Sequence, residues 1–408
     1  MKLTLRLLNG LTWLCCAAVP LSSYSAFADS YVIHAARVFD GYSIRTDAVV
    51  LVADDKIVKI DSPEAFTHRG FARIELGDAT VLPGFIELHA HLSFRQVPAE
   101  VVLRHGITTL RDVGGPLHAP YGGNGSLRVM TSGPIITAPN GYPIPGLGEH
   151  NIAIPVATET QARETVRALV AGGAVVIKVA LEPGGEAGAP WSKTHVHAGQ
   201  HLHTESQHQP ASTSQNWPLL SLSMVKAIVD EAHALGRIVS THIAETTGTQ
   251  IALDAGIDEW AHAPCTALPD AQLRQAVQQK VKVVATIDTL SKCAGIFSNV
   301  ERLAAMGAEL YYGAEIAHAD IPWGIDAQEL LYLRQAAGMT SLEVLQTATA
   351  KAGAYLNIPL LGTLLPGAPA DLIAVSGDPL QSLKLLEYPD LVISGGKIVV
   401  NHFTQTER

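Results

Sequence analysis

The middle of the chain alternates short apolar runs with segments in which apolar residues recur at helical spacing. We predict strands at 81–87, 108–111, 175–180, 238–242, 259–261, 281–286 and 310–312. Helical patterns separate several of these runs and continue after the last one, at 160–171, 222–235, 270–279, 300–306, 326–337 and 341–356. Repeated strand-then-helix units predict parallel strands with right-handed crossovers, and therefore an α/β fold.

Both ends of the chain have a different pattern, made of short β-like runs separated by turn residues such as Asp40 and Gly41. Near the start these runs cover 31–39, 48–53 and 56–60, and near the end they cover 371–375 and 391–400. We therefore expect the two ends to meet in one small sheet domain beside the α/β middle.

Composition and charge limit the classes of partner. Hydrophobic residues make up 47% of the 408 positions and charged residues 16%, which predicts a large buried core and not a disordered chain. The formal net charge is −10 and the chain has no basic block. Nucleic acid and anionic membrane surfaces are therefore poor candidate partners.

The first residues of the chain have the pattern of a secretory signal peptide. Lys2 and Arg6 precede a largely apolar stretch at 7–21, and residues 26–28 are small enough for a cleavage site. An uncleaved anchor is the alternative, but the apolar stretch is short for one. We expect a signal peptide at 1–28 and a secreted or periplasmic mature protein with no membrane partner.

Cys265 and Cys293 are the cysteines that remain after this cleavage. An exported protein could oxidise them to a disulfide. Two ordinary buried thiols are the alternative, and the sequence does not decide between them.

His89 and His91 are the first candidates for chemistry. They follow the apolar run 81–87, and residues two apart in a strand point to the same face. Neutral imidazoles placed together at the carboxyl end of a strand suit zinc. The pair alone is weak evidence, because polar residues often end a strand without any metal.

Three later residues strengthen this hypothesis. Lys178 interrupts the apolar run 175–180, and His242 and His262 end the next two strands. A carboxylate partner would explain a lone buried lysine, and hydrogen bonding would explain a lone buried histidine. Together with the His89–His91 pair, these residues occupy four successive strand ends. Their order fits one sheet, which indicates a shared site.

These residues belong to stretches by which the chain resembles the amidohydrolase superfamily, and within it the imidazolonepropionase and Xaa-Pro-dipeptidase-like branch. The resemblance spans roughly 31–400 and rests on 83–91, 105–109, 111–114, 177–179, 241–242, 261–262, 347–349, Gly362, 366–367 and 370–372. It implies a (β/α)8 TIM barrel at 83–356, flanked by a small β-sandwich domain made from 29–82 and 357–408.

The resemblance also implies a two-metal centre. His89 and His91 would bind one divalent ion, and His242 and His262 would bind a second. Lys178 would bridge the two ions as a carbamate formed with CO2. Zinc is the expected metal.

The end of strand eight departs from the family pattern. Members normally have Gly-Thr-Asp there, with the aspartate as metal ligand and general base, whereas this chain has Gly313-Ala314-Glu315. We assign that role to Glu315, with Asp320 as the alternative. Glu87 also stands where the family usually has aspartate, and the sequence leaves its role open.

A long segment at 181–220 is rich in glycine, proline, serine and histidine and has no periodicity. Since it follows a strand, it would lie on the active-site face, as a lid or a metal-loading tract; a disordered polar insertion is the alternative. Tyr142 and Trp191 are candidates for substrate contact, with ordinary packing as the alternative. The histidines of the segment are His195, His197, His201, His203 and His208.

The expected activity is hydrolysis of a carbon–nitrogen bond in a small molecule, an N-acyl amino acid or a dipeptide-like compound, through a metal-bridging hydroxide. Lactonase, phosphotriesterase or deaminase activity at the same site is the alternative, although the family's deaminases usually lack a counterpart of Lys178. A periplasmic zinc-binding protein that uses the histidine-rich segment is the non-enzyme alternative. The sequence does not decide whether the protein is a monomer or a homo-oligomer.

Overall fold

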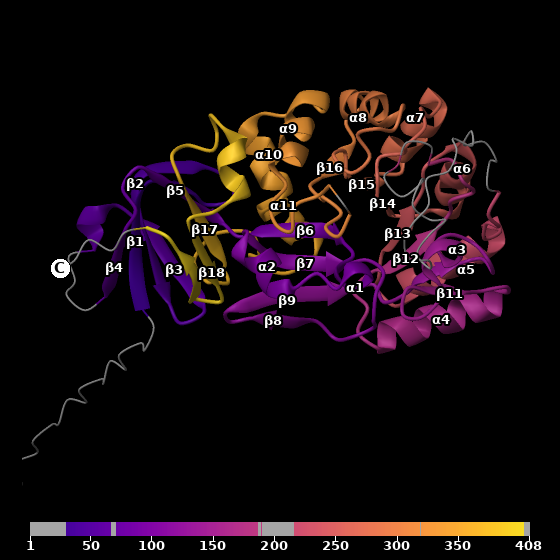
Figure 1. Cartoon of the computed structure of the whole chain (residues 1–408), viewed down its shortest axis with the longest axis horizontal. Helices are drawn as coiled ribbons and strands as arrows, with labels where there is room; N and C mark the ends of the chain where they lie inside the picture. Colours follow the sequence, from indigo (N-terminus) through magenta and orange to yellow (C-terminus); the bar gives the residue numbers. More distant parts are fainter. Residues whose placement is uncertain (1–29, 67–70, 187–188, 190–215, 319, 404–408) are drawn as a thin grey trace, which may run out of the picture.

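The computed structural model describes residues 30–66, 71–186, 189, 216–318 and 320–403 (Figure 1). The predicted signal peptide, Trp191 and the histidine-rich tract at 195–208 lie outside these residues. Within the described part of the chain, no helix combines the length and the apolar character needed to cross a membrane.

Strands from both ends of the chain form one mixed sheet, where the indigo and yellow ribbons of Figure 1 lie together. Strand β17 from the C-terminal part pairs antiparallel with β5 from the N-terminal part. This confirms that the two ends meet in one sheet. Its order is β19 (Lys397–Asn401), β18 (Leu391–Ser394), β17 (Leu372–Ser376), β5 (Ala79–Pro83), β1 (Ser30–Phe39), β2 (Ile44–Ala53) and β3 (Lys56–Asp61), with β4 (Ala72–Glu75) also on β1.

The middle of the chain contributes two further sheets, built mainly from parallel strands. The larger has the order β11 (Ala153–Pro155), β10 (Ile135–Thr137), β12 (Ile177–Ala180), β13 (Val239–His242), β14 (Glu259–Trp260), β15 (Lys282–Val284) and β16 (Glu309–Tyr311). The smaller has the order β6 (Phe85–Ala90), β7 (Ile107–Asp112), β9 (Ser126–Thr131) and β8 (Tyr121–Gly123), with only β8 antiparallel.

The strand pairing does not close these two sheets into one barrel. On one side, β6 approaches the chain after β16 through an isolated parallel bridge between Ala90 and Ile316. On the other side, the amide of Val175 donates a hydrogen bond to the carbonyl of Thr131 at 2.9 Å. The predicted α/β fold with parallel strands is confirmed, and a closed eight-stranded barrel is not formed by the ladders themselves.

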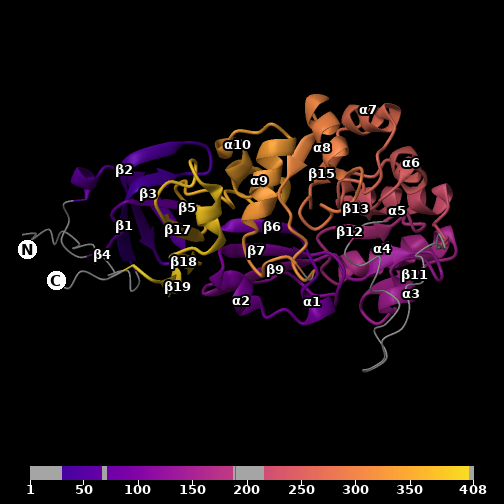
Figure 2. The same cartoon turned by 45° about the horizontal axis from the view of Figure 1, so that its top comes forward.

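Helices cover the outside of the larger sheet, and α6, α7 and α8 follow one another outside β13 to β15 (Figure 2). Several begin at polar caps: Thr158 accepts from the amide of Gln161 and Ser221 from that of Met224. The helices are α1 (Leu92–Arg95), α2 (Ala99–Arg104), α3 (Ile144–Leu147), α4 (Glu159–Ala171), α5 (Leu222–Ala234), α6 (Thr246–Ala255), α7 (Asp270–Gln278), α8 (Ile296–Ala305), α9 (Ala327–Ala336), α10 (Ser341–Thr347) and α11 (Ala350–Tyr355), with short 3-10 turns η1 (Pro63–Ala65) and η3 (Leu383–Glu387).

The predicted strand 81–87 is two strands that belong to different sheets. β5 ends at Pro83 and β6 begins at Phe85, so the chain passes from the terminal sheet to the parallel sheet at Gly84. A Cβ atom on Gly84 would lie 2.2 Å from Oγ1 of Thr108, so this crossing needs glycine. A continuous apolar run cannot reveal such a change of sheet, because both halves are buried. The predicted helix 341–356 is likewise divided, into α10 and α11.

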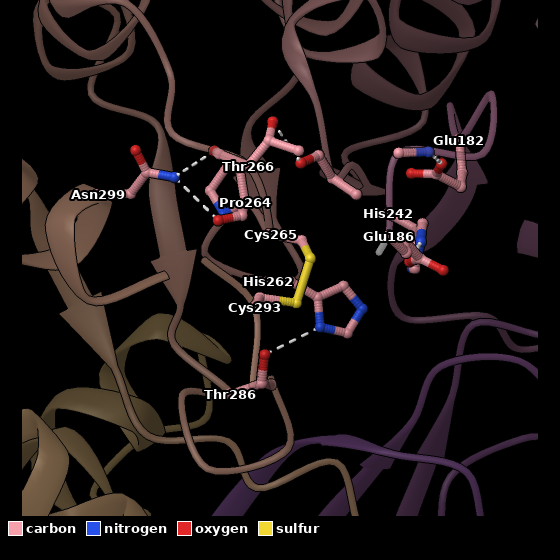
Figure 3. The surroundings of a disulfide bond; sticks show 12 residues. Glu182, Glu186, His242, His262, Pro264, Cys265, Thr266, Thr286, Cys293 and Asn299 are labelled. Atoms are coloured by element: carbon pink, nitrogen blue, oxygen red, sulfur yellow. Dashed lines mark hydrogen bonds and ion pairs between the residues drawn. A yellow bond between two sulfur atoms is a disulfide. The ribbon is translucent and has the colours of Figure 1, made fainter. Parts of the chain in front are cut away.

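A disulfide joins Cys265 and Cys293 (Figure 3). It links the loop after β14 to the loop after β15, two neighbouring strands of the larger sheet. The alternative of two free thiols is therefore not the state found here.

Removing this disulfide should lower the free energy of unfolding. The bond closes a loop with a sequence separation of 28 residues, for which loop-closure entropy predicts a loss of about 3–4 kcal/mol. Urea unfolding of the Cys265→Ala/Cys293→Ala double variant, beside the oxidised and reduced wild type, measures it. An unchanged midpoint on both reduction and substitution would contradict the expectation.

Candidate metal centre

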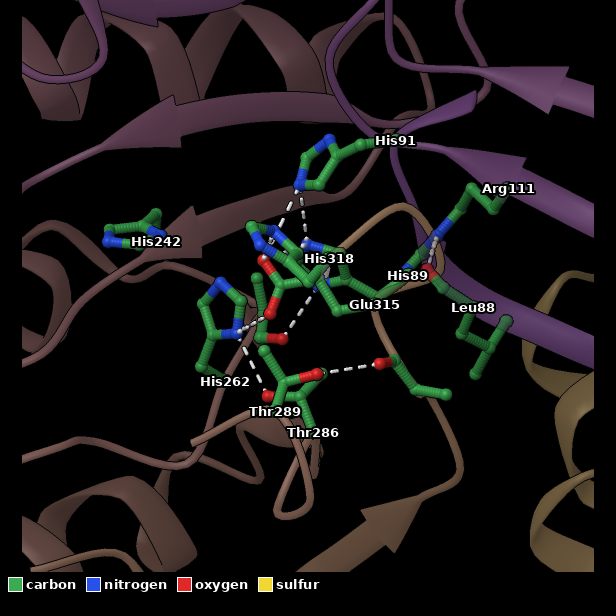
Figure 4. Close-up of polar contacts among 12 residues, drawn as sticks. Leu88, His89, His91, Arg111, His242, His262, Thr286, Thr289, Glu315 and His318 are labelled. Atoms are coloured by element: carbon green, nitrogen blue, oxygen red, sulfur yellow. Dashed lines mark hydrogen bonds and ion pairs between the residues drawn. The ribbon is translucent and has the colours of Figure 1, made fainter. Parts of the chain in front are cut away.

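The carboxyl ends of the parallel strands bring the candidate ligands together (Figure 4). His89 lies in β6 and Lys178 in β12, while His242 ends β13. His262 follows β14 by two residues, and Glu315 follows β16 by four. All five are at most 4% exposed, so this is a buried polar cluster within an otherwise apolar core.

His89, His91 and Glu315 form the first group of donors. The Nε2 atoms of His89 and His91 are 3.2 Å apart, and they lie 3.7 Å and 3.6 Å from Oε1 of Glu315. Nδ1 of His89 is 2.8 Å from the carbonyl oxygen of Ala261, which can only accept, so Nδ1 is the donor. This bond leaves the Nε2 lone pair of His89 facing the group, as a metal ligand requires.

His262 connects this group to His242. Its ring centre is 4.5 Å from that of His89 and 4.8 Å from that of His242. Nδ1 of His262 lies 2.9 Å from the hydroxyl of Thr286 and 3.5 Å from Oε2 of Glu315. The four predicted imidazole ligands therefore form a continuous row around the carboxylate of Glu315.

Burial keeps these imidazoles in the form that binds metal. It lowers the pKa of His91 and that of His242 to about 4, and it holds the pKa values of His89 and His262 well below the usual range. Neutral imidazole carries a free lone pair, and protonated imidazole does not.

Lys178 is a buried amine within the apolar strand β12. Its side chain is 1% exposed, and Nζ has no hydrogen-bond partner among the described residues. Burial lowers the pKa of Lys178 to about 7, although the carboxylates of Glu315 and Glu259 act in the opposite direction. A substantial fraction of this amine is therefore neutral near pH 7, and the neutral amine is the nucleophilic form.

Glu315 is the carboxylate that the structure places in this row. Burial by itself would raise its pKa, but the imidazoles of His262 and His318 hold the pKa well below the usual range. Asp320, the alternative from the sequence, has a side chain that is 76% exposed and lies 3.6 Å from Nζ of Lys292. Position in the fold thus separates the two carboxylates.

Glu87 holds the backbone of the two segments that carry His89 and Glu315. One carboxylate oxygen accepts from the amide of His89 at 2.7 Å, and the other accepts from the amide of Ala314 at 2.9 Å. Burial raises the pKa of Glu87 to about 8. This residue therefore positions the chain on both sides of the cluster and does not face it.

Arg111 and Glu259 form a second buried support. Nη2 of Arg111 donates to both oxygens of Glu259 at 2.7 Å and 2.8 Å, and Nε donates to the carbonyl of Leu88 at 2.8 Å. The hydroxyl of Tyr355 donates to Glu259 at 2.6 Å. The pair is fully buried and hydrogen-bonded on both sides, which is the condition under which a buried ion pair is tolerated.

Three further titratable residues belong to the site and were not predicted from the sequence. Nε2 of His318 lies 3.1 Å from Oε1 of Glu315. Glu182 and Glu186 lie beside His242, and Glu186 contacts its Nε2 atom (Figure 3). They follow strands β12 and β16 by two to seven residues, so a search of the loops after strand ends would have found them.

Tyr142, the predicted substrate contact, is next to the centre. Its ring stacks on His242 with 4.5 Å between the ring centres, and Trp217 lies 5.3 Å from Tyr142. The role of Tyr142 in substrate binding stays a prediction, and Trp191 lies outside the described residues.

Acid should weaken the metal-free protein through His91. Its pKa is about 4 in the folded chain and 6.5 as the reference value, so its contribution to stability is complete above pH 6.5 and is lost as pH falls towards 4. The unfolding free energy of wild type minus that of His91→Gln should therefore drop by about 3 kcal/mol between pH 7 and pH 4. Urea titrations of both apo proteins measure it, and a difference that stays constant with pH would refute it.

Parts of the chain are similar in sequence to known proteins. The model of the amidohydrolase family matches residues 270–399. Ochratoxinase of Aspergillus niger is 30% identical over 205 residues, which cover 45% of this chain and 42% of that protein. The match thus spans less than half the length of that relative.

Solved structures share the fold over most of the chain. The crystal structure of A. niger ochratoxinase has a TM-score of 0.70 at 20% identity and covers 91% of this chain and 96% of that chain. A Xaa-Pro dipeptidase with methionine bound in its active site has a TM-score of 0.68 at 21% identity, with 90% and 99% covered. The chain is thus similar to the amidohydrolase family over residues 270–399, and it shares its fold with these solved structures.

Proposed function

We propose that this protein is a metal-dependent hydrolase that cleaves a carbon–nitrogen bond of an amide or peptide-like small molecule. The observation that carries the proposal is the convergence of four buried imidazoles, Lys178 and Glu315 at the carboxyl ends of parallel strands. The names of the relatives agree with it: one is an ochratoxinase, and another is a Xaa-Pro dipeptidase with methionine in its active site.

The donor set fits two divalent ions. His89 and His91 would hold one ion, His242 and His262 the other, and Glu315 would complete the set. Neutral imidazoles and carboxylates suit zinc. The unpartnered Nζ of Lys178 fits the same centre, because a carbamate formed there with CO2 would give the buried amine two ligand oxygens.

Metal bound at this centre would polarise the scissile carbonyl and bring the pKa of a water molecule towards neutrality. The chain itself supplies the proton transfer. Glu315 is ionised and central to the row, so its carboxylate can take a proton and pass it to the leaving nitrogen. His318, 3.1 Å from that carboxylate, orients it.

Two further features belong to the proposal. The two sheets of the middle domain would act as one (β/α)8 barrel, with the site at its carboxyl end. The protein would be exported to the periplasm or secreted after removal of 1–28, a location consistent with the disulfide between Cys265 and Cys293.

Glu315→Gln should lower kcat/KM for amide hydrolysis on the order of a hundredfold or more, because the proton acceptor is lost while the shape is kept. Asp320→Asn is the matched control, since its side chain is exposed and pairs with Lys292. Steady-state kinetics on a panel of dipeptides and N-acyl amino acids tests the pair. Loss of activity in Asp320→Asn, with activity kept in Glu315→Gln, would reverse the assignment.

Lys178→Ala should remove most of the activity and lower the bound metal from two equivalents to one or fewer. Lys226→Ala, at an exposed position of α5, is the control. Elemental analysis beside kinetics separates the two effects. Full activity in Lys178→Ala would exclude a bridging carbamate, and active wild type with only trace metal would exclude the proposed function.

A further inference from the structure

Two carboxylates that the proposed chemistry does not use lie beside His242. Glu182 and Glu186 come from the loop directly after β12, and one ligand atom of each of these three residues lies within 4.8 Å of those of the others. Glu182 is 1% and Glu186 5% exposed. Figure 3 shows both next to His242, on the side of the site away from Thr286.

The loop that carries these carboxylates is tied down at several points. One oxygen of Glu182 accepts from the amides of Gly184 and Gly185. The carbonyl of Pro183 accepts from the amide of Trp217 at 3.1 Å. The side chain of Glu182 is therefore held in position by its own loop.

Glu182 has an acceptor that the described residues leave unused. Its second oxygen, Oε2, is buried and has no hydrogen-bond partner among them. Glu186, in contrast, lies against Nε2 of His242. A buried carboxylate oxygen without a donor is costly, so it indicates a donor that a ligand brings.

The walls beside these carboxylates are aromatic. Tyr142 stacks on His242, and Trp217 lies against Tyr142, with ring centres 4.5 Å and 5.3 Å apart. Carboxylates together with aromatic faces suit an organic cation. The aromatic faces beside the carboxylates favour an ammonium group as the occupant.

We propose that Glu182 and Glu186 form a subsite for the free α-ammonium group of a dipeptide-like substrate. This inference rests on the proposed function, and it selects between the two substrate classes named there, because an N-acyl amino acid has no such cation. In a dipeptide the α-nitrogen lies about 2.5 Å from the scissile carbonyl carbon. Since Glu186 contacts His242, an amine bound here would leave that carbonyl at the metal centre.

Matched peptides test the subsite in the full-length, metal-loaded enzyme. We expect wild type to hydrolyse L-alanyl-L-phenylalanine about tenfold to a hundredfold more efficiently than its N-acetyl derivative, measured as kcat/KM. Glu182→Gln and Glu186→Gln should each remove most of this preference by slowing only the free-amine peptide. Glutamine keeps an oxygen for the amides of Gly184 and Gly185, so the loop should stay folded.

Glu301→Gln, an exposed substitution on α8, is the control and should keep the preference. Equal or better hydrolysis of the acetylated peptide by wild type would overturn the subsite. An equal loss of kcat/KM for both peptides in the variants would also overturn it. Loss of one metal equivalent in Glu182→Gln would overturn it too, because Glu182 would then be a metal ligand.

Binding measurements distinguish failure of this inference from failure of the proposed function. If neither peptide is hydrolysed, calorimetric dissociation constants of the same two peptides decide the matter. Tighter binding of the free amine by wild type, lost in Glu182→Gln, would support the subsite even if the reaction is a different one. Equal or undetectable binding of both peptides would overturn it.

Discussion

The buried carboxylate of Glu87 is the contact on which the arrangement of the metal centre depends. The first strand of the middle domain, β6, and the chain after its last strand, β16, share only an isolated bridge, so the ladder there is incomplete. Glu87 accepts from the amides of His89 and Ala314 and joins these two segments. One side chain thus fixes the distance between the histidine pair and Glu315, which follows Ala314 directly.

The disulfide between Cys265 and Cys293 imposes a comparable constraint near His262. The disulfide holds the loop after β15 against the loop after β14. Thr286 at the start of the first of these loops contacts Nδ1 of His262, and the hydroxyl of Thr289 donates to the carbonyl of Ala314 at 2.8 Å. The covalent bond therefore stabilises the segment that orients His262, one of the proposed metal ligands.

The electrostatics of the site follow from burial and from mutual contact. Desolvation favours neutral imidazoles and a neutral Lys178, while the surrounding imidazoles keep Glu315 ionised. These are the protonation states that metal binding and carbamate formation require. Glu182 and Glu186 lie on one side only, beside His242, and burial raises the pKa of Glu182 to about 8, so a cation bound there would stabilise its ionised form.

The sequence by itself determined which residues could meet. His89, Lys178, His242 and His262 each lie at or just beyond the end of an apolar run, and the carboxyl ends of neighbouring parallel strands lie together whatever the loops do. The pairing of the two chain ends also followed from local pattern, because both ends consist of short strands with turn residues between them.

Tertiary structure alone decided the rest, since it depends on contacts between segments far apart in the chain. The crossing at Gly84 exists because Thr108 occupies the space where a side chain would be. Glu315 faces the imidazoles and Asp320 faces solvent because the chain turns between them, which spacing along the sequence cannot show. The positions of Glu182 and Glu186 depend on loop hydrogen bonds, and the union of Cys265 with Cys293 depends on two loops lying side by side.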